Sequence, residues 1–274
     1  MLEKIQKMDQ RIIYLVLLIA LSFPMFRPLG LPVSIGQTSQ DLYDFVDQLD
    51  PGSVVVLSID YSPGAAAQIH PQTIAITKHL LSKKIKIVYM GLVQYASQFT
   101  TDAIAKAGDY NPVYGQDYVD LGFKPGDEAT VSAMSKDIHA TFVTDSAGTA
   151  IAELPMMADI KTASDIDLVI AFDSGGTRHW YVGQMQALYG TPVGCALNSV
   201  NVTNTMPYYD AGQVIGLLNG LRGAAEYEAL IGDPGEATIN LDSISSGHLV
   251  IILFILFGNI AYFGLRNSNK RKEA

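Results

Sequence analysis

The sequence predicts a doubly wound α/β domain, with a mostly parallel sheet and helices on both faces, flanked by an N-terminal and a C-terminal transmembrane helix. Three observations support this prediction. Apolar, β-branched runs alternate with stretches of helical periodicity through the middle of the chain. A shorter apolar run opens the chain, and a long uncharged run closes it. Alternating strands and helices are typical of a parallel sheet whose right-handed crossovers bring the strand carboxyl ends to one edge.

The first apolar segment, residues 12–26, reads IIYLVLLIALSFPMF. A helix of this length reaches about 22 Å, which is less than the roughly 30 Å of a hydrocarbon core. We therefore extend the predicted span to residues 12–33, with Arg27 reaching toward the interface. The basic side chains of Lys4, Lys7 and Arg11 precede it in a tail of residues 1–11. A cleaved signal peptide and a buried core helix are the alternatives, but no small-x-small cleavage motif follows, so we favour an uncleaved signal anchor.

The second apolar segment, residues 248–265, contains LVIILFILFGNIAYFGL and no charged residue. A basic tail follows it over residues 266–274. Because Lys and Arg concentrate on the cytoplasmic side, both termini are expected in the cytoplasm and the domain between the spans outside it, in a two-pass protein of the cell membrane. Asn259 lies inside this segment, where its amide could bond to the first helix, to a helix of another subunit, or to its own backbone.

The domain is expected over residues 34–231, followed by a turn-rich linker at 232–247. Strands are predicted at 53–60, 85–92, 118–123, 167–172 and 192–197. Helices are predicted at 37–49, 71–83, 94–107, 128–139, 177–189 and 211–231, and residues 149–157 are ambiguous between strand and loop. The last predicted helix carries glycines at spacings of three and four, which would permit close packing on the sheet or a self-association surface: Gly212, Gly216, Gly220 and Gly223.

Composition and motifs exclude several classes of function. The net charge is −9 and the basic residues gather at the chain ends, so the domain has no basic stripe and we expect no nucleic-acid binding. Cys195 is the single cysteine, and the histidines have no zinc-ligand spacing, so neither a disulfide nor a metal site is predicted. No G-x-G-x-x-G, P-loop or G-x-S-x-G motif occurs, so the sequence identifies no cofactor and no catalytic residue.

The candidate ligand-binding residues follow the predicted strands, because open parallel sheets bind ligands at the strand carboxyl ends. The glycine-containing turn in FDSGGTRHW could present amide groups and Arg178 to a small anionic ligand. The alternative is that Asp173 or Ser174 simply caps the helix while the glycines form the turn. Asp60 and Asp173 could also form a carboxylate pair. The full set of candidates is Asp60, Ser62, Asp173, Ser174, Gly175, Gly176, Thr177, Arg178 and Asn198.

The stretches YGQDYVDLGFKPG, DIDLVIAF and GLLNGLRGAAEYEAL resemble a group of bacterial membrane-anchored α/β proteins with no assigned activity. The resemblance covers most of the domain and implies no reaction, cofactor or catalytic residue. We therefore predict a non-enzymatic domain that binds a ligand or a partner protein. It would belong to a membrane assembly, as a homo-oligomer or with other membrane subunits. The alternative is an envelope hydrolase or transferase that uses the carboxylates at the strand ends.

Overall fold

The computed structural model describes residues 9–273, with side chains described for residues 9–265. The chain divides into two compact units, one formed by Val33–Ala237 and the other by the segments Met1–Pro32 and Thr238–Ala274. The basic side chains that set the predicted topology lie, except for Arg11, outside the described side chains: Lys4, Lys7, Arg266, Lys270, Arg271 and Lys272.

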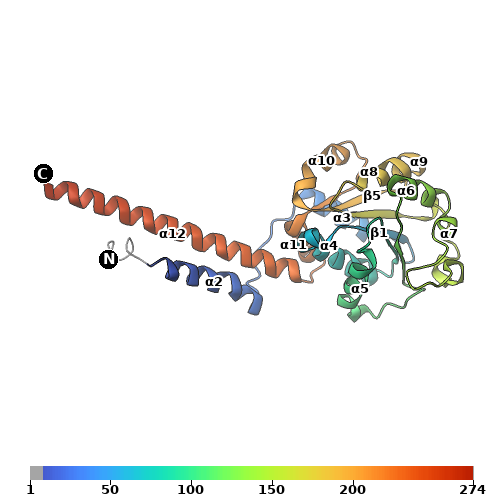
Figure 1. The fold of residues 1–274 in the computed structure, drawn as a ribbon, viewed down its shortest axis with the longest axis horizontal. Coiled ribbons are helices and arrows are strands. Elements are labelled where there is room, and N and C mark those ends of the chain that lie inside the picture. The colour runs from blue at the N-terminus through green and yellow to red at the C-terminus, as the bar shows by residue number, and fades with distance from the viewer. Residues whose placement is uncertain (1–8, 274) are drawn as a thin grey trace. The chain divides into compact units, whose positions relative to one another are not determined.

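In the described part of the chain, the larger unit is built on six parallel strands in the order β3-β2-β1-β4-β5-β6. Figure 1 shows helices packed around this sheet. This arrangement confirms the predicted α/β class with a parallel sheet. The reversal of strand order between β1 and β4 makes the carboxyl ends of those two strands the switch point of the sheet. The strands are β1 (Val54–Asp60), β2 (Lys86–Gly91), β3 (Tyr118–Phe123), β4 (Leu168–Asp173), β5 (Val193–Leu197) and β6 (Leu217–Asn219).

Helices cover both faces of this sheet. Alternate residues of each central strand are therefore buried on opposite sides. Val56, Val88 and Val169 point into a core shared with the helices after β3 and β4. These are α6 (Asp127–Lys136), α7 (Ile138–Thr141), α8 (Arg178–Tyr181), a π-helical turn (Val182–Gln186) and α9 (Ala187–Tyr189). Val55 and Leu57 point into the opposite core. That core is covered by α3 (Gln37–Asp47), α4 (Pro63–Ser82), α5 (Ala96–Lys106) and α11 (Gly220–Leu230).

The predicted helix over 211–231 is wrong in its first half. Residues 217–219 form β6, and only Gly220–Leu230 is helical. Gly216 lies at the start of β6, where an added Cβ would come within 2.8 Å of the Cα and Cβ of Leu42 on α3. Gly194 on β5 faces the same leucine side chain. These glycines therefore allow α3 to pack closely on the sheet, and they do not form one stripe along a helix.

Three other elements differ from the sequence prediction. Helix α4 begins at Pro63, because a proline is tolerated in a first turn, and it continues through Pro71. An unpredicted helix, α10 (Ser199–Asp210), follows β5 directly. The ambiguous residues 149–157 form two 3-10 turns. The 3-10 turns of the domain are Gly108–Tyr110, Ile151–Glu153, Pro155–Met157 and Ala163–Asp165.

The smaller unit contains α2 (Gln10–Phe26) and α12 (Glu236–Glu273). Helix α12 begins inside the segment that the sequence predicts as a linker. Among the described residues, Glu236–Leu265 is the stretch that is long and apolar enough to cross a membrane, and Gln10–Phe26 is apolar but shorter. The two helices contact each other through Ser246 Oγ, which donates to the carbonyl of Ala20 at 2.9 Å.

Candidate functional site

Two of the predicted site residues, Asp60 and Asp173, lie side by side at the switch point of the sheet. They are register partners at the ends of β1 and β4, and neighbouring strands lie about 4.8 Å apart. Both side chains are buried. The two residues are therefore neighbours at the sheet edge, and the hydrogen bonds of each carboxylate decide what it can do.

The Asp173 carboxylate is held by the turn and helix that follow it. Its Oδ1 accepts the backbone N–H groups of Gly175 and Gly176, each at 2.6 Å. Its Oδ2 accepts from Arg178 Nη1 at 2.6 Å in a buried ion pair. Because Asp173 occupies these two amides and neutralises Arg178, the turn has the contacts of a capped structural turn, which was the alternative reading of FDSGGTRHW.

The Asp60 carboxylate is also used inside the domain. It accepts from the backbone N–H of Leu92 and from Ser58 Oγ, both at 2.7 Å, and Ser58 is hydrogen-bonded in turn to Tyr181. Burial raises the pKa of Asp60 to about 6, although the hydrogen bonds from Leu92 and Ser58 oppose this shift. Neither Asp60 nor Asp173 lines any of the three cavities described below.

The remaining predicted residues are placed separately around this pair. Ser174 lies next to Asp60, with its backbone N–H donating to the Asp60 carbonyl at 3.3 Å, and Thr177 is buried at the start of α8. Ser62 is exposed before α4, and its side chain makes no capping bond there. Asn198 precedes α10, and its Oδ1 is buried without a protein partner, as is Arg178 Nε.

A cavity of ≈ 410 Å³ opens further along the same edge of the sheet, at the carboxyl end of β3. We call it the edge cavity. The first turn of α5, the end of β3 with the residue after it, and the segment 142–146 supply its walls, so its residues are distant in sequence. They are Ser97, Leu121, Gly122, Phe123, Lys124, Phe142, Val143, Thr144, Asp145 and Ser146.

Lys124 gives the edge cavity its positive charge. Its backbone N–H donates to the Gly91 carbonyl at 3.0 Å, which fixes the residue between the ends of β2 and β3. Its Nζ lies 5.9 Å from the centre of the Phe142 ring, within the range of a cation–π contact. Lys124 forms no ion pair with any side chain that the structure describes.

Three residues with hydroxyl groups line the edge cavity together with Lys124. The side chains of Ser97, Thr144 and Ser146 make no hydrogen bond to the described residues. Asp145 is the carboxylate in the lining, but it is buried and accepts bonds from the Tyr114 hydroxyl and the backbone N–H groups of Ala147 and Thr149. The groups left to bind a ligand are therefore one ammonium and three hydroxyls, a set that suits an anion.

Gly122 keeps the cavity floor open. It has a φ of +77°, and an added Cβ would lie 3.2 Å from Ser146 Cβ and 3.7 Å from Ser97 Oγ. The glycine thus lies between the two serines that line the cavity. The sequence prediction does not include Lys124 or these hydroxyls, because its candidate residues follow only the strands β1, β4 and β5. The motif GFKPGD, which follows the predicted strand at 118–123, was the available signal.

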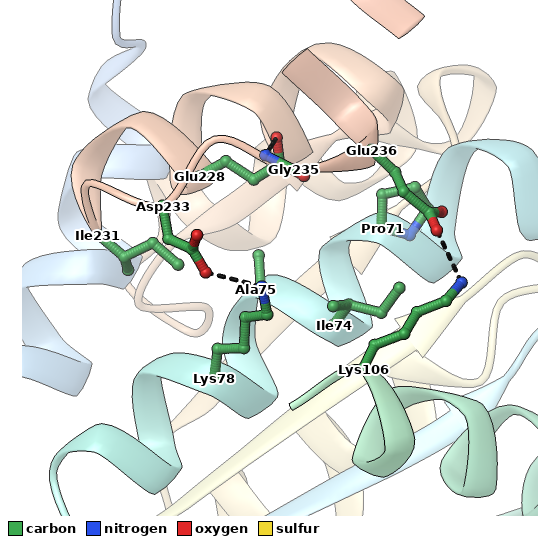
Figure 2. Close-up of a pocket in the computed structure, with 10 residues that line it drawn as sticks. All are labelled: Pro71, Ile74, Ala75, Lys78, Lys106, Glu228, Ile231, Asp233, Gly235 and Glu236. Atoms are coloured by element: carbon green, nitrogen blue, oxygen red, sulfur yellow. Dashed lines mark hydrogen bonds and ion pairs between the residues drawn. The ribbon is translucent and has the colours of Figure 1, made fainter. Parts of the chain in front are cut away.

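A second, smaller cavity of ≈ 210 Å³ lies between α4, α5 and the segment after α11 (Figure 2). Its floor is apolar, with Ile74, Ala75 and Ile231. Its two lysines are already neutralised, because Lys78 pairs with Asp233 at 2.7 Å and Lys106 with Glu236 at 2.8 Å (Figure 2). An anion entering here would have to break ion pairs, so the edge cavity is the better candidate site.

The described residues contain no group of three or more His, Cys, Asp and Glu side chains that could hold a metal ion. Comparison with family profiles, curated proteins and solved structures gave no match to this chain. The resemblance to bacterial membrane-anchored proteins therefore stays a prediction, and the site is argued from its geometry.

Proposed function

We propose that this chain is a membrane-tethered binding protein whose α/β domain takes a small anionic ligand in the edge cavity. The observation that carries this proposal is the shared lining of the edge cavity: Lys124 has no ion pair, and the hydroxyls of Ser97, Thr144 and Ser146 have no hydrogen bond, with the residues that the structure describes. A hydrogen bond to a charged group contributes about 1.5–3 kcal/mol, and hydroxyls add specificity for the oxygens of a carboxylate or phosphate. The carboxyl edge of an open parallel sheet is also the usual place for such a site.

Contacts between α2 and α12 support a two-pass anchor with both termini on one side of the membrane, and the basic tails favour the cytoplasm as that side. Ala20 and Leu21 of α2 contact Ser246 and Gly247 of α12, whereas the later residues 29–31 contact the earlier Asp242. The two segments therefore run antiparallel, as in a membrane hairpin. The Asp242 carboxylate accepts the three backbone N–H groups of residues 29–31, which joins the segment after α2 to the start of α12.

The assembly part of the proposal rests on Asn259. Its side chain is exposed on α12 and has no hydrogen-bond partner among the described residues, so α2 does not satisfy it there. An amide within the hydrocarbon region favours a partner helix. We propose that this partner belongs to a second copy of the chain or to another membrane subunit.

Calorimetric titration of inorganic phosphate into the full-length protein in nanodiscs tests the binding function. Wild-type protein should bind, and Lys124→Met should bind at least about tenfold more weakly, because about 1.5 kcal/mol or more is lost with the charged donor. Lys161→Met, at an exposed lysine away from the cavity, is the matched control and should bind like wild type. Absence of binding by wild-type protein, or equal binding by Lys124→Met, would reject the proposal.

A further inference from the structure

A shallow groove shares Lys124 with the edge cavity. We call it the α6–α7 groove. Its volume is ≈ 410 Å³, and Lys124 lines both hollows. The two hollows are also adjacent along the chain, because Thr141 lines the groove and the next residue, Phe142, lines the edge cavity. The full lining is Lys124, Pro125, Gly126, Ala129, Thr130, Ala133, Asp137, Ala140 and Thr141.

The groove differs from the edge cavity in the chemistry that it offers. The methyl groups of Ala129, Ala133 and Ala140 lie on exposed helix positions along it. Its polar side chains are satisfied locally. Thr130 Oγ1 donates to the Pro125 carbonyl at 2.7 Å, and Thr141 Oγ1 donates to the Asp137 carbonyl at 2.7 Å.

Asp137 Oδ1 accepts the backbone N–H of Ala140 at 2.9 Å and caps α7, so this exposed carboxylate is the charged group of the lining besides Lys124. A ligand in the groove would therefore meet small apolar groups and few free hydrogen-bonding groups. In the edge cavity it would meet a free ammonium and free hydroxyls. The two hollows suit the two halves of an amphiphilic molecule.

We infer that the ligand is a small amphiphile, with an anionic head at Lys124 in the edge cavity and an apolar arm in the α6–α7 groove. This inference rests on the proposed function and adds the ligand class. The alanines leave room for the arm, and Lys124 binds the head where the two hollows meet. Lys124 thus marks the junction of head and arm.

Two probes separate this inference from the proposed function. Inorganic phosphate carries the head alone, and n-butyl phosphate adds a four-carbon arm that does not form micelles at the concentrations needed. Each is titrated into the full-length protein in nanodiscs. Burying two or more methylenes should make n-butyl phosphate bind about tenfold more tightly than inorganic phosphate. Equal affinities would overturn the arm while leaving the anion site standing, and absence of binding by both probes would reject the anion site itself.

A variant tests whether the apolar arm of the ligand lies in the α6–α7 groove. Ala133→Phe fills the groove from an exposed position of α6, so the fold should tolerate it, and unfolding curves check this. The variant should lose most of the preference for n-butyl phosphate. Ala187→Phe, at an exposed alanine of α9, is the matched control and should keep it. A folded Ala133→Phe protein that keeps the full preference, or that loses both probes, would overturn the division into head and arm sites.

Discussion

Burial strongly alters the chemistry of Asp60. Burial raises its pKa from 3.8 to about 6. Between those values the folded state keeps a proton that the unfolded chain has released, so this group's contribution to stability is present below about pH 4 and is lost as the pH rises through 6. A shift of this size corresponds to about 3 kcal/mol.

The first prediction follows from Asp60. Asp60→Asn retains an oxygen for the Leu92 N–H and a polar group for Ser58, but it cannot ionise. We compare the free energy of unfolding of the variant with that of wild type. This difference should shift in favour of the variant by up to about 3 kcal/mol between pH 4 and pH 8. Denaturant unfolding at both pH values measures this gain. An unchanged difference between the two proteins would contradict it.

His79 should give the opposite pH dependence. Burial lowers its pKa despite its contact with Asp47, and its Nδ1 is hydrogen-bonded to the Tyr227 hydroxyl at 2.8 Å. The unfolded chain binds a proton near pH 6.5 that the folded state resists, so stability is lost as the pH falls below that value. His79→Gln should lose less stability than wild type between pH 7 and pH 5. A variant with the wild-type slope over this range would show that His79 does not control it.

At the scale of elements, close packing of α3 on the sheet depends on Gly216. An added Cβ would come within 2.8 Å of Leu42, whose side chain is fully buried. Gly216→Ala should therefore destabilise the domain by about 1–3 kcal/mol through overpacking. Gly183→Ala, where an added Cβ meets nothing within 4 Å, should not be destabilising. Thermal unfolding of both variants compares them, and equal stabilities would exclude this role for Gly216.

Some elements are predictable from the sequence and others are not. SVVVLSID and DLVIAF are predictable as strands because both faces of β1 and β4 are buried. GLLNGLRG has glycines at helical spacing, but Gly216 is needed for close approach to Leu42, a tertiary contact that local periodicity does not report. Helix α10 was missed because its sequence is polar and contains Pro207.

The site was predictable in principle and only partly predicted. The rule that ligands bind at strand carboxyl ends indicates the same edge of the sheet as the proposed edge cavity. The Asp60 and Asp173 pairing also follows from two equivalent strand ends. However, the free groups of the edge cavity come from the start of α5, the end of β3 and the loop at 143–146. Their proximity depends on how these loops pack, which no spacing in the sequence encodes.

For the whole molecule, the antiparallel contacts of α2 and α12 predict that the domain and the C-terminal tail face opposite sides of the membrane. Single cysteines at Thr101, an exposed residue of α5, and at Ser268, after the apolar stretch, test this in a Cys195→Ala background. A membrane-impermeant maleimide should label Thr101→Cys in intact cells and Ser268→Cys only after permeabilisation. Labelling of both positions in intact cells, or the reverse pattern, would contradict the two-pass topology.

The most direct test of the binding account locates the anion on the wild-type protein. The protein in nanodiscs is treated with an amine-reactive ester, either with phosphate at ten times its measured Kd or with chloride at equal ionic strength. Mass spectrometry then measures the rate at which each lysine is acetylated. Phosphate should slow the modification of Lys124 about tenfold, because about one molecule in eleven has a free site, and Lys161 should react at the same rate in both buffers. Equal rates at Lys124 would contradict an anion site in the edge cavity.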